Sequence, residues 1–254
     1  MVLTKLYFLP VVIFVTIPTT FLITYSVSVW DGHVNPELPY ISDTGTFSPE
    51  SCIFGQFLNI AAFVLSICVY LRYLEVKHYP ELSGSGLAIS PKLNRATFIL
   101  GQLSCLGLDL VANFQETNVP AMHMVGANLL FVIGTIHFLL QVYISRKMPE
   151  LVPKNLVVIR AVLVLICAVT TLITVPTTLL AIYEYKGPKD DRIKKWTPED
   201  GGYDLHLVSA AAEWILTLAY CLLILTFAPE FYNLELVEPI IRYKRRKTST
   251  KTQY

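Results

Sequence analysis

Long apolar runs that are almost free of charge recur six times along this chain. The hydrocarbon core of a bilayer is about 30 Å thick and needs about 20 apolar helical residues, which each run supplies. The pattern predicts six transmembrane helices, at about residues 6–29, 51–71, 96–115, 123–145, 158–183 and 205–228. We therefore expect an all-α, polytopic membrane protein with one domain over residues 1–231 and a tail over residues 232–254.

The composition points to the same class of protein. The chain is 54% hydrophobic and only 15% charged, with a mean hydropathy of +0.53. A soluble domain is less apolar and carries about 25% charged residues. The formal net charge of +1 offers no general basic surface for nucleic acid, so membrane lipids are the expected partners.

The first apolar run could also be read as a cleaved signal peptide, because Lys5 precedes it and small residues lie near its end. The run of 24 residues is longer than the apolar region of a signal peptide, which spans about 7–15 residues. It also contains Pro10 and Pro18. A retained transmembrane helix is the favoured interpretation.

Lysine and arginine are divided unequally between the two sides of the predicted bundle. One side carries fifteen of the twenty cations and the other carries five, all in the loop between Lys186 and Tyr203. Cytosolic loops of membrane proteins are enriched in Lys and Arg, so both termini are predicted to be cytosolic. The loop over residues 32–50 then faces the lumen or the outside.

This loop over residues 32–50 has the most distinctive composition in the chain. Pro36, Pro39 and Pro49 restrict the backbone, and residues 42–45 can close a side-chain-capped turn. The loop is therefore predicted to hold one shape and to cap the bundle rather than to act chemically. Its signature residues are Pro39, Tyr40, Ser42, Asp43, Thr44 and Gly45.

Polar side chains gather in the lumenal half of the predicted spans. Asp109, Asn113 and Glu116 share one helical face through i, i+4 and i+7 spacing, and Glu213 follows His206 by seven residues. The candidate polar cluster consists of Asn59, Asp109, Asn113, Glu116, His123, His206 and Glu213. These groups could join helices through hydrogen bonds, or line a lumen-open cavity for a lipid head group, a proton or a small solute.

A third interpretation of the cluster is a metal-dependent hydrolase. Its ligands would come from Asp109, His123, His206 and Glu213. The short His and carboxylate spacings of such sites are missing within any one helix, so no metal and no other cofactor is expected. No motif frames a serine or cysteine nucleophile, and no glycine-rich phosphate loop occurs, so the chain is not expected to be an enzyme.

A dense basic cluster follows the last predicted span. Such a cluster attracts anionic lipid at roughly 1 kcal/mol per cation near the surface, although it could serve only to set the topology. The candidate anionic-lipid contacts are Arg242, Lys244, Arg245, Arg246 and Lys247.

Several segments resemble the family of DNA-damage-regulated autophagy modulators. The resemblance rests on residues 38–46 of the loop, residues 111–115 with His123, and the last lumenal loop with His206, Glu213 and Trp214. Residues 92–94, 103–107 and 211–214 are more similar to the second vertebrate member than to the first. Asp109 departs from the family pattern, so no family-wide role is assigned to it. The basic tail also differs, so no lysosomal sorting signal is carried over to it.

The resemblance implies a six-helix protein of the lysosomal membrane that promotes macroautophagy and is linked to apoptosis. Other endomembranes and the plasma membrane are alternative locations. A non-enzymatic adaptor or a lipid-linked regulator is the favoured function, with lipids and unidentified proteins of the autophagy machinery as partners. Transport of a lipid, proton or small solute through the polar cluster is the main alternative, and the hydrolase is the third.

Overall fold

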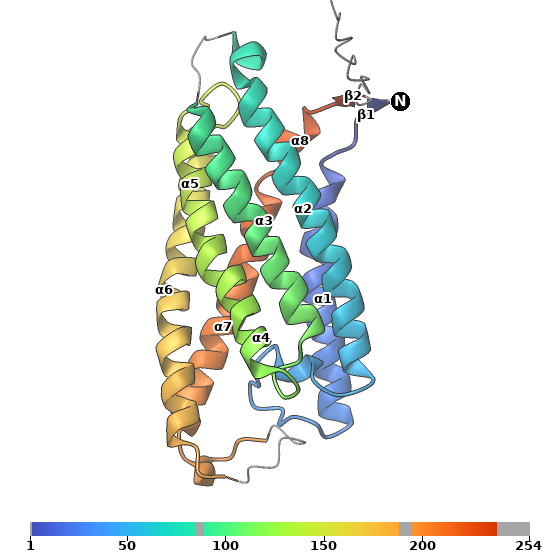
Figure 1. Cartoon of the computed structure of the whole chain (residues 1–254), viewed down its shortest axis with the longest axis vertical. Helices are drawn as coiled ribbons and strands as arrows, with labels where there is room; N and C mark the ends of the chain where they lie inside the picture. The colour runs from blue at the N-terminus through green and yellow to red at the C-terminus, as the bar shows by residue number, and fades with distance from the viewer. Residues whose placement is uncertain (1, 85–88, 188–194, 238–254) are drawn as a thin grey trace, which may run out of the picture.

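The computed structural model describes residues 2–84, 89–187 and 195–237, and it is a bundle of long helices (Figure 1). Six helical segments in these residues are long and apolar enough to cross a membrane, which confirms the predicted all-α membrane fold. The long helices are α1 (Phe8–Trp30), α2 (Glu50–Ser83), α3 (Pro91–Asn113), α4 (Pro120–Asn128), α5 (Gly134–Arg146), α6 (Lys154–Glu184) and α7 (Tyr203–Leu225). A π-helical turn, η2 (Leu129–Ile133), joins α4 to α5 into one span.

The shorter elements lie at the two ends of the bundle. One end, here called the terminal end, carries α8 (Ala228–Tyr232) and a short antiparallel pair of strands, β1 (Val2–Leu3) and β2 (Leu236–Val237). The other, the loop end, carries the 3-10 turns η1 (Asp43–Gly45) and η3 (Pro198–Asp200). The strand pair places both ends of the described chain on the same side of the bundle.

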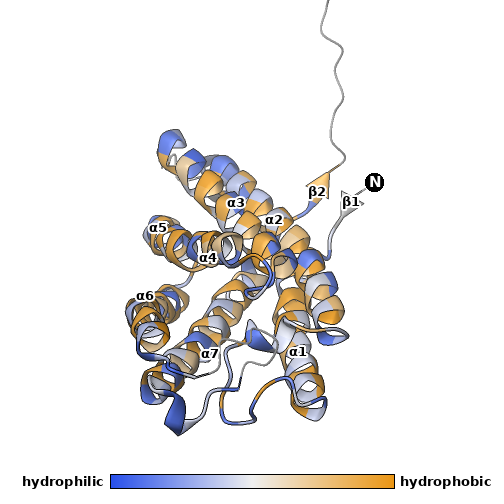
Figure 2. Ribbon diagram, turned by 60° about the horizontal axis from the view of Figure 1, so that its bottom comes forward, coloured by the Kyte–Doolittle hydropathy of each residue, from blue (hydrophilic) through white to orange (hydrophobic). Residues whose placement is uncertain are grey.

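The helices form a closed ring in chain order, which Figure 2 shows from the loop end. Each helix packs against the next one, and α1 closes the ring by packing against α7. Leu216 and Leu223 of α7, with Leu58 of α2 and Ile13 of α1, are fully buried in the shared core. Each span therefore has one face in the bundle and one face outside.

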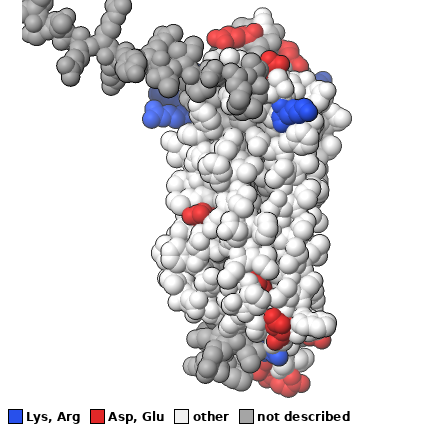
Figure 3. All heavy atoms as spheres, turned by 90° about the vertical axis from the view of Figure 1, so that its right-hand side faces the viewer, with Lys and Arg blue, Asp and Glu red and all other residues white. Residues whose placement is uncertain are grey.

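The outer surface of the bundle is apolar along most of its length. Large side chains such as Phe63, Leu165 and Leu172 are 63–75% exposed there. Figure 3 shows a largely uncharged band between two charged ends on the face it presents. Hydrocarbon contact explains this exposure, because a soluble protein would not leave a continuous apolar belt in water.

Small residues bring α3 close to the α4–η2 span. A Cβ added at Gly107 would lie 2.4 Å from the backbone nitrogen of Leu130, so these two helices touch through their backbones. The Tyr220 hydroxyl donates a 2.7 Å hydrogen bond to the Phe131 carbonyl in the π turn. A side chain from α7 therefore satisfies a carbonyl in the irregular part of this span.

The α2 helix is longer than the predicted span of residues 51–71, since it continues to Ser83. The hydropathy pattern predicts that this span ends before Arg72 and assigns the charge of Arg72 to the cytosolic side. Arg72 and Glu75 are instead buried in the helix, with relative exposures of 3% and 4%. Arg72 and Glu75 are tolerated inside the bundle because they pair with other buried charges.

Four buried charges form one network near the terminal end. Arg72 Nη1 lies 2.8 Å from Glu75 Oε2 and 2.8 Å from Glu230 Oε1. Arg160 of α6 also pairs with Glu230, and its guanidinium carbon lies 3.9 Å from the ring centre of Phe227. Glu230 therefore links α2 and α6 to α8, a role that no pattern in the sequence indicated.

Candidate functional site

The loop over residues 31–49 folds into the bundle at the loop end. Thr44 is fully buried, and its hydroxyl donates a 2.7 Å hydrogen bond to the Ile41 carbonyl and lies 3.1 Å from the Thr24 hydroxyl of α1. A Cβ at Gly45 would lie 2.4 Å from the Phe54 ring of α2, so any larger residue would force the ring or the loop to shift. The loop is therefore packed as a plug between α1 and α2.

The turn within this loop differs in one respect from the expected side-chain-capped turn. Ser42 precedes η1 but makes no side-chain cap bond to it. Its hydroxyl instead donates a 3.0 Å hydrogen bond to Glu116 Oε2, on the short connection between α3 and α4. Ser42 therefore holds the plug against another part of the bundle.

Three further contacts attach the plug to α7. The Ile41 backbone nitrogen donates a 3.0 Å hydrogen bond to Glu213 Oε2, and Trp214 Nε1 donates a 2.9 Å bond to the Pro39 carbonyl. The Tyr40 hydroxyl is hydrogen-bonded to Ser209. Burial raises the pKa of Tyr40 to about 12.

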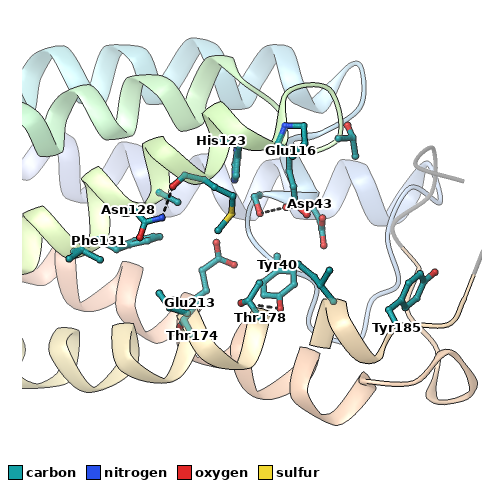
Figure 4. A pocket seen from close by; sticks show the side chains of 18 of the residues that line it. Tyr40, Asp43, Glu116, His123, Asn128, Phe131, Thr174, Thr178, Tyr185 and Glu213 are labelled. Atoms are coloured by element: carbon teal, nitrogen blue, oxygen red, sulfur yellow. Dashed lines mark hydrogen bonds between the residues drawn. The ribbon is translucent and has the colours of Figure 1, made fainter. Parts of the chain in front are cut away.

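Beneath the plug lies a cavity of about 570 Å³, shown in Figure 4. Its walls are the plug, the α4–η2 span, α6, and one acidic side chain of α7. Its lining includes Tyr40, Ser42, Asp43, Glu116, His123, Met124, Ala127, Asn128, Phe131, Val132, Thr174, Val175, Thr178, Ile182, Tyr185, Trp196 and Glu213.

The cavity has a polar end and an apolar side. Asp43, Glu116 and His123 lie toward the loop end in Figure 4. Met124 of α4 and Ile182 of α6, which also line the cavity, are 39% and 57% exposed. The cavity therefore has an apolar side that is formed by side chains of α4 and α6.

Glu213 lies deep in the bundle. It is ten residues from the start of α7, or about 15 Å along the helix at 1.5 Å per residue. Figure 4 shows its carboxylate directed into the cavity, while one of its oxygens accepts the Ile41 bond. It is the one residue of α7 in the lining.

The seven residues of the predicted polar cluster separate into two groups. Glu116, His123 and Glu213 line the cavity. His206 borders it, because its ring stacks on Trp196 with ring centres 4.6 Å apart and meets Tyr40 edge-on.

The second group joins α2 to α3 and does not line the cavity. Asn59 and Asn113 exchange two hydrogen bonds of 3.0 and 2.8 Å. The Asn113 amide also donates to the Asp109 carbonyl at 2.7 Å. Hydrogen bonding between helices is the role that this geometry serves.

The four ligands considered for a hydrolase do not meet at one point. His123 Nδ1 is 2.8 Å from the Phe114 carbonyl, and Asp109 lies with the asparagine pair instead. In the described part of the chain, one group of three possible ligands has atoms within 4.8 Å of one another: Asp31, His33 and Glu50. No pattern in the sequence indicated this group, although His33 and Glu50 lie within the distinctive loop over residues 32–50.

The basic residues proposed to contact anionic lipid, Arg242, Lys244, Arg245, Arg246 and Lys247, lie outside the described residues. Their contact with lipid therefore remains a prediction.

The fold and the cavity define a multi-pass membrane protein with six spans and a loop-capped cavity at one end. A family model described as the Frag1/DRAM/Sfk1/Cwh43P N-terminal domain matches residues 5–234. The chain belongs to this family, as the resemblance in the loop and in the later spans indicated.

The chain is similar to curated members over most of its length. It is 40% identical to DNA damage-regulated autophagy modulator protein 2 of Mus musculus over 231 residues, which cover 90% of this chain and 85% of the relative. The human protein 2 is 37% identical over 236 residues with the same coverage. The human protein 1 is 36% identical over 232 residues, covering 90% of this chain and 92% of the relative. These values confirm the greater resemblance to the second vertebrate member.

No solved structure matches the chain.

Proposed function

We propose that this chain modulates macroautophagy in the lysosomal membrane as a non-enzymatic regulator that binds a lipid-like amphiphile in its loop-end cavity. The names of its relatives, DNA damage-regulated autophagy modulator proteins 1 and 2, support the process. The relatives are named as modulators rather than as enzymes, which supports a regulatory role. A link to apoptosis belongs to the same proposal through the family resemblance.

The observation that carries the proposal is the shape and polarity of the cavity. A volume of about 570 Å³ is within the range of small-molecule sites. The apolar side chains of α4 and α6 that line the cavity suit a hydrocarbon chain, and the polar end under the plug suits a head group. An amphiphile would therefore enter from the bilayer between these two helices.

The proposed orientation puts the loop end in the lumen. Both ends of the described chain lie at the terminal end, as an even number of spans requires. On the face shown in Figure 3, acidic side chains lie at both ends, whereas Lys and Arg lie mainly at the terminal end. The excess of Lys and Arg predicted for the terminal side supports a cytosolic location for that end. The basic tail would then meet anionic lipid or protein partners on the cytosolic side.

A substitution that fills the cavity tests the proposal. Ala127 of α4 lines the cavity, so Ala127→Trp should exclude a bound amphiphile. Ala161 is exposed on α6 and does not line the cavity, so Ala161→Trp is the matched control. Both variants would be expressed in cells that lack endogenous family members, with their location checked by microscopy.

Two measurements give the outcome. A photoactivatable, clickable fatty-acid probe should label peptides of α4 and α6 in the wild type and in Ala161→Trp. Ala127→Trp should lower this labelling at least about tenfold, and autophagic flux should fall with it. Equal labelling would refute the binding site, and lost labelling with normal flux would refute its role in autophagy.

Transport is a second candidate, favoured by the position of Glu213 in the cavity about 15 Å from the start of α7. A transporter of a lipid, proton or small solute would use this carboxylate along its path. Flux in reconstituted vesicles should then be abolished by Glu213→Gln. It should persist in Glu184→Gln, which changes an exposed acid outside the lining. Equal flux in the two variants would exclude this candidate.

A further inference from the structure

Three possible metal ligands converge where the loop leaves α1 and enters α2. Asp31 is the residue after α1, His33 follows two positions later, and Glu50 is the first residue of α2. His33 Nδ1 lies 2.5 Å from Glu50 Oε1, and ligand atoms of all three residues lie within 4.8 Å of one another. The group therefore joins both ends of the segment that forms the plug.

The backbone and one aromatic ring position His33. Gly32 has φ of +72°, which reverses the chain so that His33 returns over the end of α1. The His33 backbone nitrogen donates a 2.8 Å hydrogen bond to the Ser28 carbonyl. Its imidazole packs against the Phe47 ring, with ring centres 4.9 Å apart. The imidazole is thus held against Glu50 before any ion binds.

The second oxygen of Glu50 is the observation that points to a ligand. The Glu50 side chain is fully buried, and its Oε2 atom is buried without a hydrogen-bond partner. A buried carboxylate oxygen ordinarily has a donor, because its removal from water is costly. A cation bound among Asp31, His33 and Glu50 would supply the missing interaction.

The donor set selects the class of cation. One imidazole nitrogen and two carboxylates suit Zn²⁺ or a similar divalent transition metal, whereas Ca²⁺ and Mg²⁺ prefer oxygen ligands alone. Two ligand atoms of a tetrahedral zinc ion, each about 2.0 Å from the metal, are about 3.3 Å apart. The distance from His33 Nδ1 to Glu50 Oε1 is 2.5 Å, and the ligand atoms of the three residues are at most 4.8 Å apart. Small side-chain movements can bring these distances to the zinc value.

The local charge also fits a divalent ion. Asp31 and Glu50 contribute two negative charges, and His33 is neutral when it binds a metal. Lys195 Nζ is close by, since a Cβ on Gly32 would lie 3.7 Å from it. One lysine leaves one negative charge unbalanced in this group of residues.

We propose that Asp31, His33 and Glu50 form a zinc-class site that fastens the two ends of the plug together. The bound ion stabilises the segment that roofs the cavity, and water completes its coordination. The proposal does not depend on the proposed function, because metal binding is measured on the purified chain alone.

The test uses the full-length protein purified in detergent, stripped with a chelator and dialysed against Zn²⁺. Elemental analysis should find about one zinc per chain, and Co²⁺ should give a tetrahedral absorption band at the same site. His33→Ala and Asp31→Asn should each weaken binding at least about tenfold. Zinc should raise the melting temperature of the wild type and leave that of His33→Ala unchanged.

A second His–Glu pair supplies the matched control. His78 Nδ1 lies 2.9 Å from Glu81 Oε2, but both side chains are exposed. Neither residue belongs to the group of three possible ligands found among the described residues. His78→Ala should therefore bind zinc as the wild type does. Asp31 is exposed, so Asp31→Asn is expected to fold even if a variant of buried Glu50 does not.

Absence of stoichiometric zinc from the wild type would overturn the proposal. Unchanged zinc affinity in folded Asp31→Asn and His33→Ala would do the same. An equal loss of zinc affinity in His33→Ala and His78→Ala would also overturn it.

Discussion

Glu230→Gln is expected to destabilise the fold because Glu230 is the anion shared by two buried guanidinium groups. It pairs with Arg72 at 2.8 Å and with Arg160, and the side chains of all three are only 1–4% exposed. Gln keeps the size of the side chain and removes its charge. Two buried cations would then share Glu75 as their one remaining acid in the network.

The magnitude follows from this burial. Removing one partner of a buried ion pair costs about 3–5 kcal/mol, because the other charge stays buried without compensation. Solvent screening does not reduce this estimate, since water does not reach these groups. The 3.9 Å contact between Arg160 and the Phe227 ring is already present in the wild type, so it does not compensate for the lost pair. We expect a loss of about 3 kcal/mol or more, which is at least a hundredfold in the unfolding equilibrium.

The assay is reversible unfolding of the purified protein in mixed detergent micelles, followed by tryptophan fluorescence. Glu81→Gln is the control, because the Glu81 side chain is 78% exposed and its ion pair should contribute less than about 1 kcal/mol. The double variant Arg160→Met with Glu230→Leu should recover much of the stability, since apolar groups can replace a buried pair. A loss below about 1 kcal/mol for Glu230→Gln would refute the reasoning.

Three further substitutions test the plug and the helix contacts. Gly45→Ala should cost about 1–3 kcal/mol, because its Cβ would meet the Phe54 ring at 2.4 Å, and Phe54→Leu should restore part of the melting temperature. An unchanged melting temperature in Gly45→Ala would contradict the packed plug. Tyr40→Phe should lower the free energy of unfolding by about 0.5–1.5 kcal/mol in the same assay, because its hydrogen bonds are lost. An unchanged free energy would show that these bonds contribute nothing. Asn113→Leu should lower the free energy of unfolding by about 1 kcal/mol, because it leaves Asn59 unpaired. Leucine at both positions should change this free energy little. Equal losses in the single and the double variant would argue against the pair.

Part of the site could be predicted from local sequence. The prolines and small polar residues of the loop over residues 32–50 indicated an ordered cap, and the structure has Thr44 fully buried and Gly45 packed on Phe54. Turn chemistry acts over a few residues, so it can be read from the sequence. The partner of Ser42 could not be read in this way, because Glu116 is 74 positions away in the chain.

The polar cluster shows the same limit. Helical spacing placed Asp109, Asn113 and Glu116 on one face, yet Asn113 pairs with Asn59 of α2 while Glu116 contacts the loop. The α3 helix ends at Asn113, so the helical period does not extend to Glu116. The direction in which a residue faces also depends on which neighbours its helix packs against.

The sequence by itself determined the six spans, because the transfer of a segment into hydrocarbon depends mainly on its own length and composition. Only the tertiary structure decided which charges are buried together. Arg72 and Arg160 are among the fifteen cations assigned to the cytosolic side from the sequence, whereas both meet Glu230, which is 158 and 70 positions away from them. The structure also decided that the loop covers a cavity lined by α4 and α6 and that Asp31, His33 and Glu50 converge. These features depend on how distant segments approach one another, and neither hydropathy nor local turn chemistry carries that information.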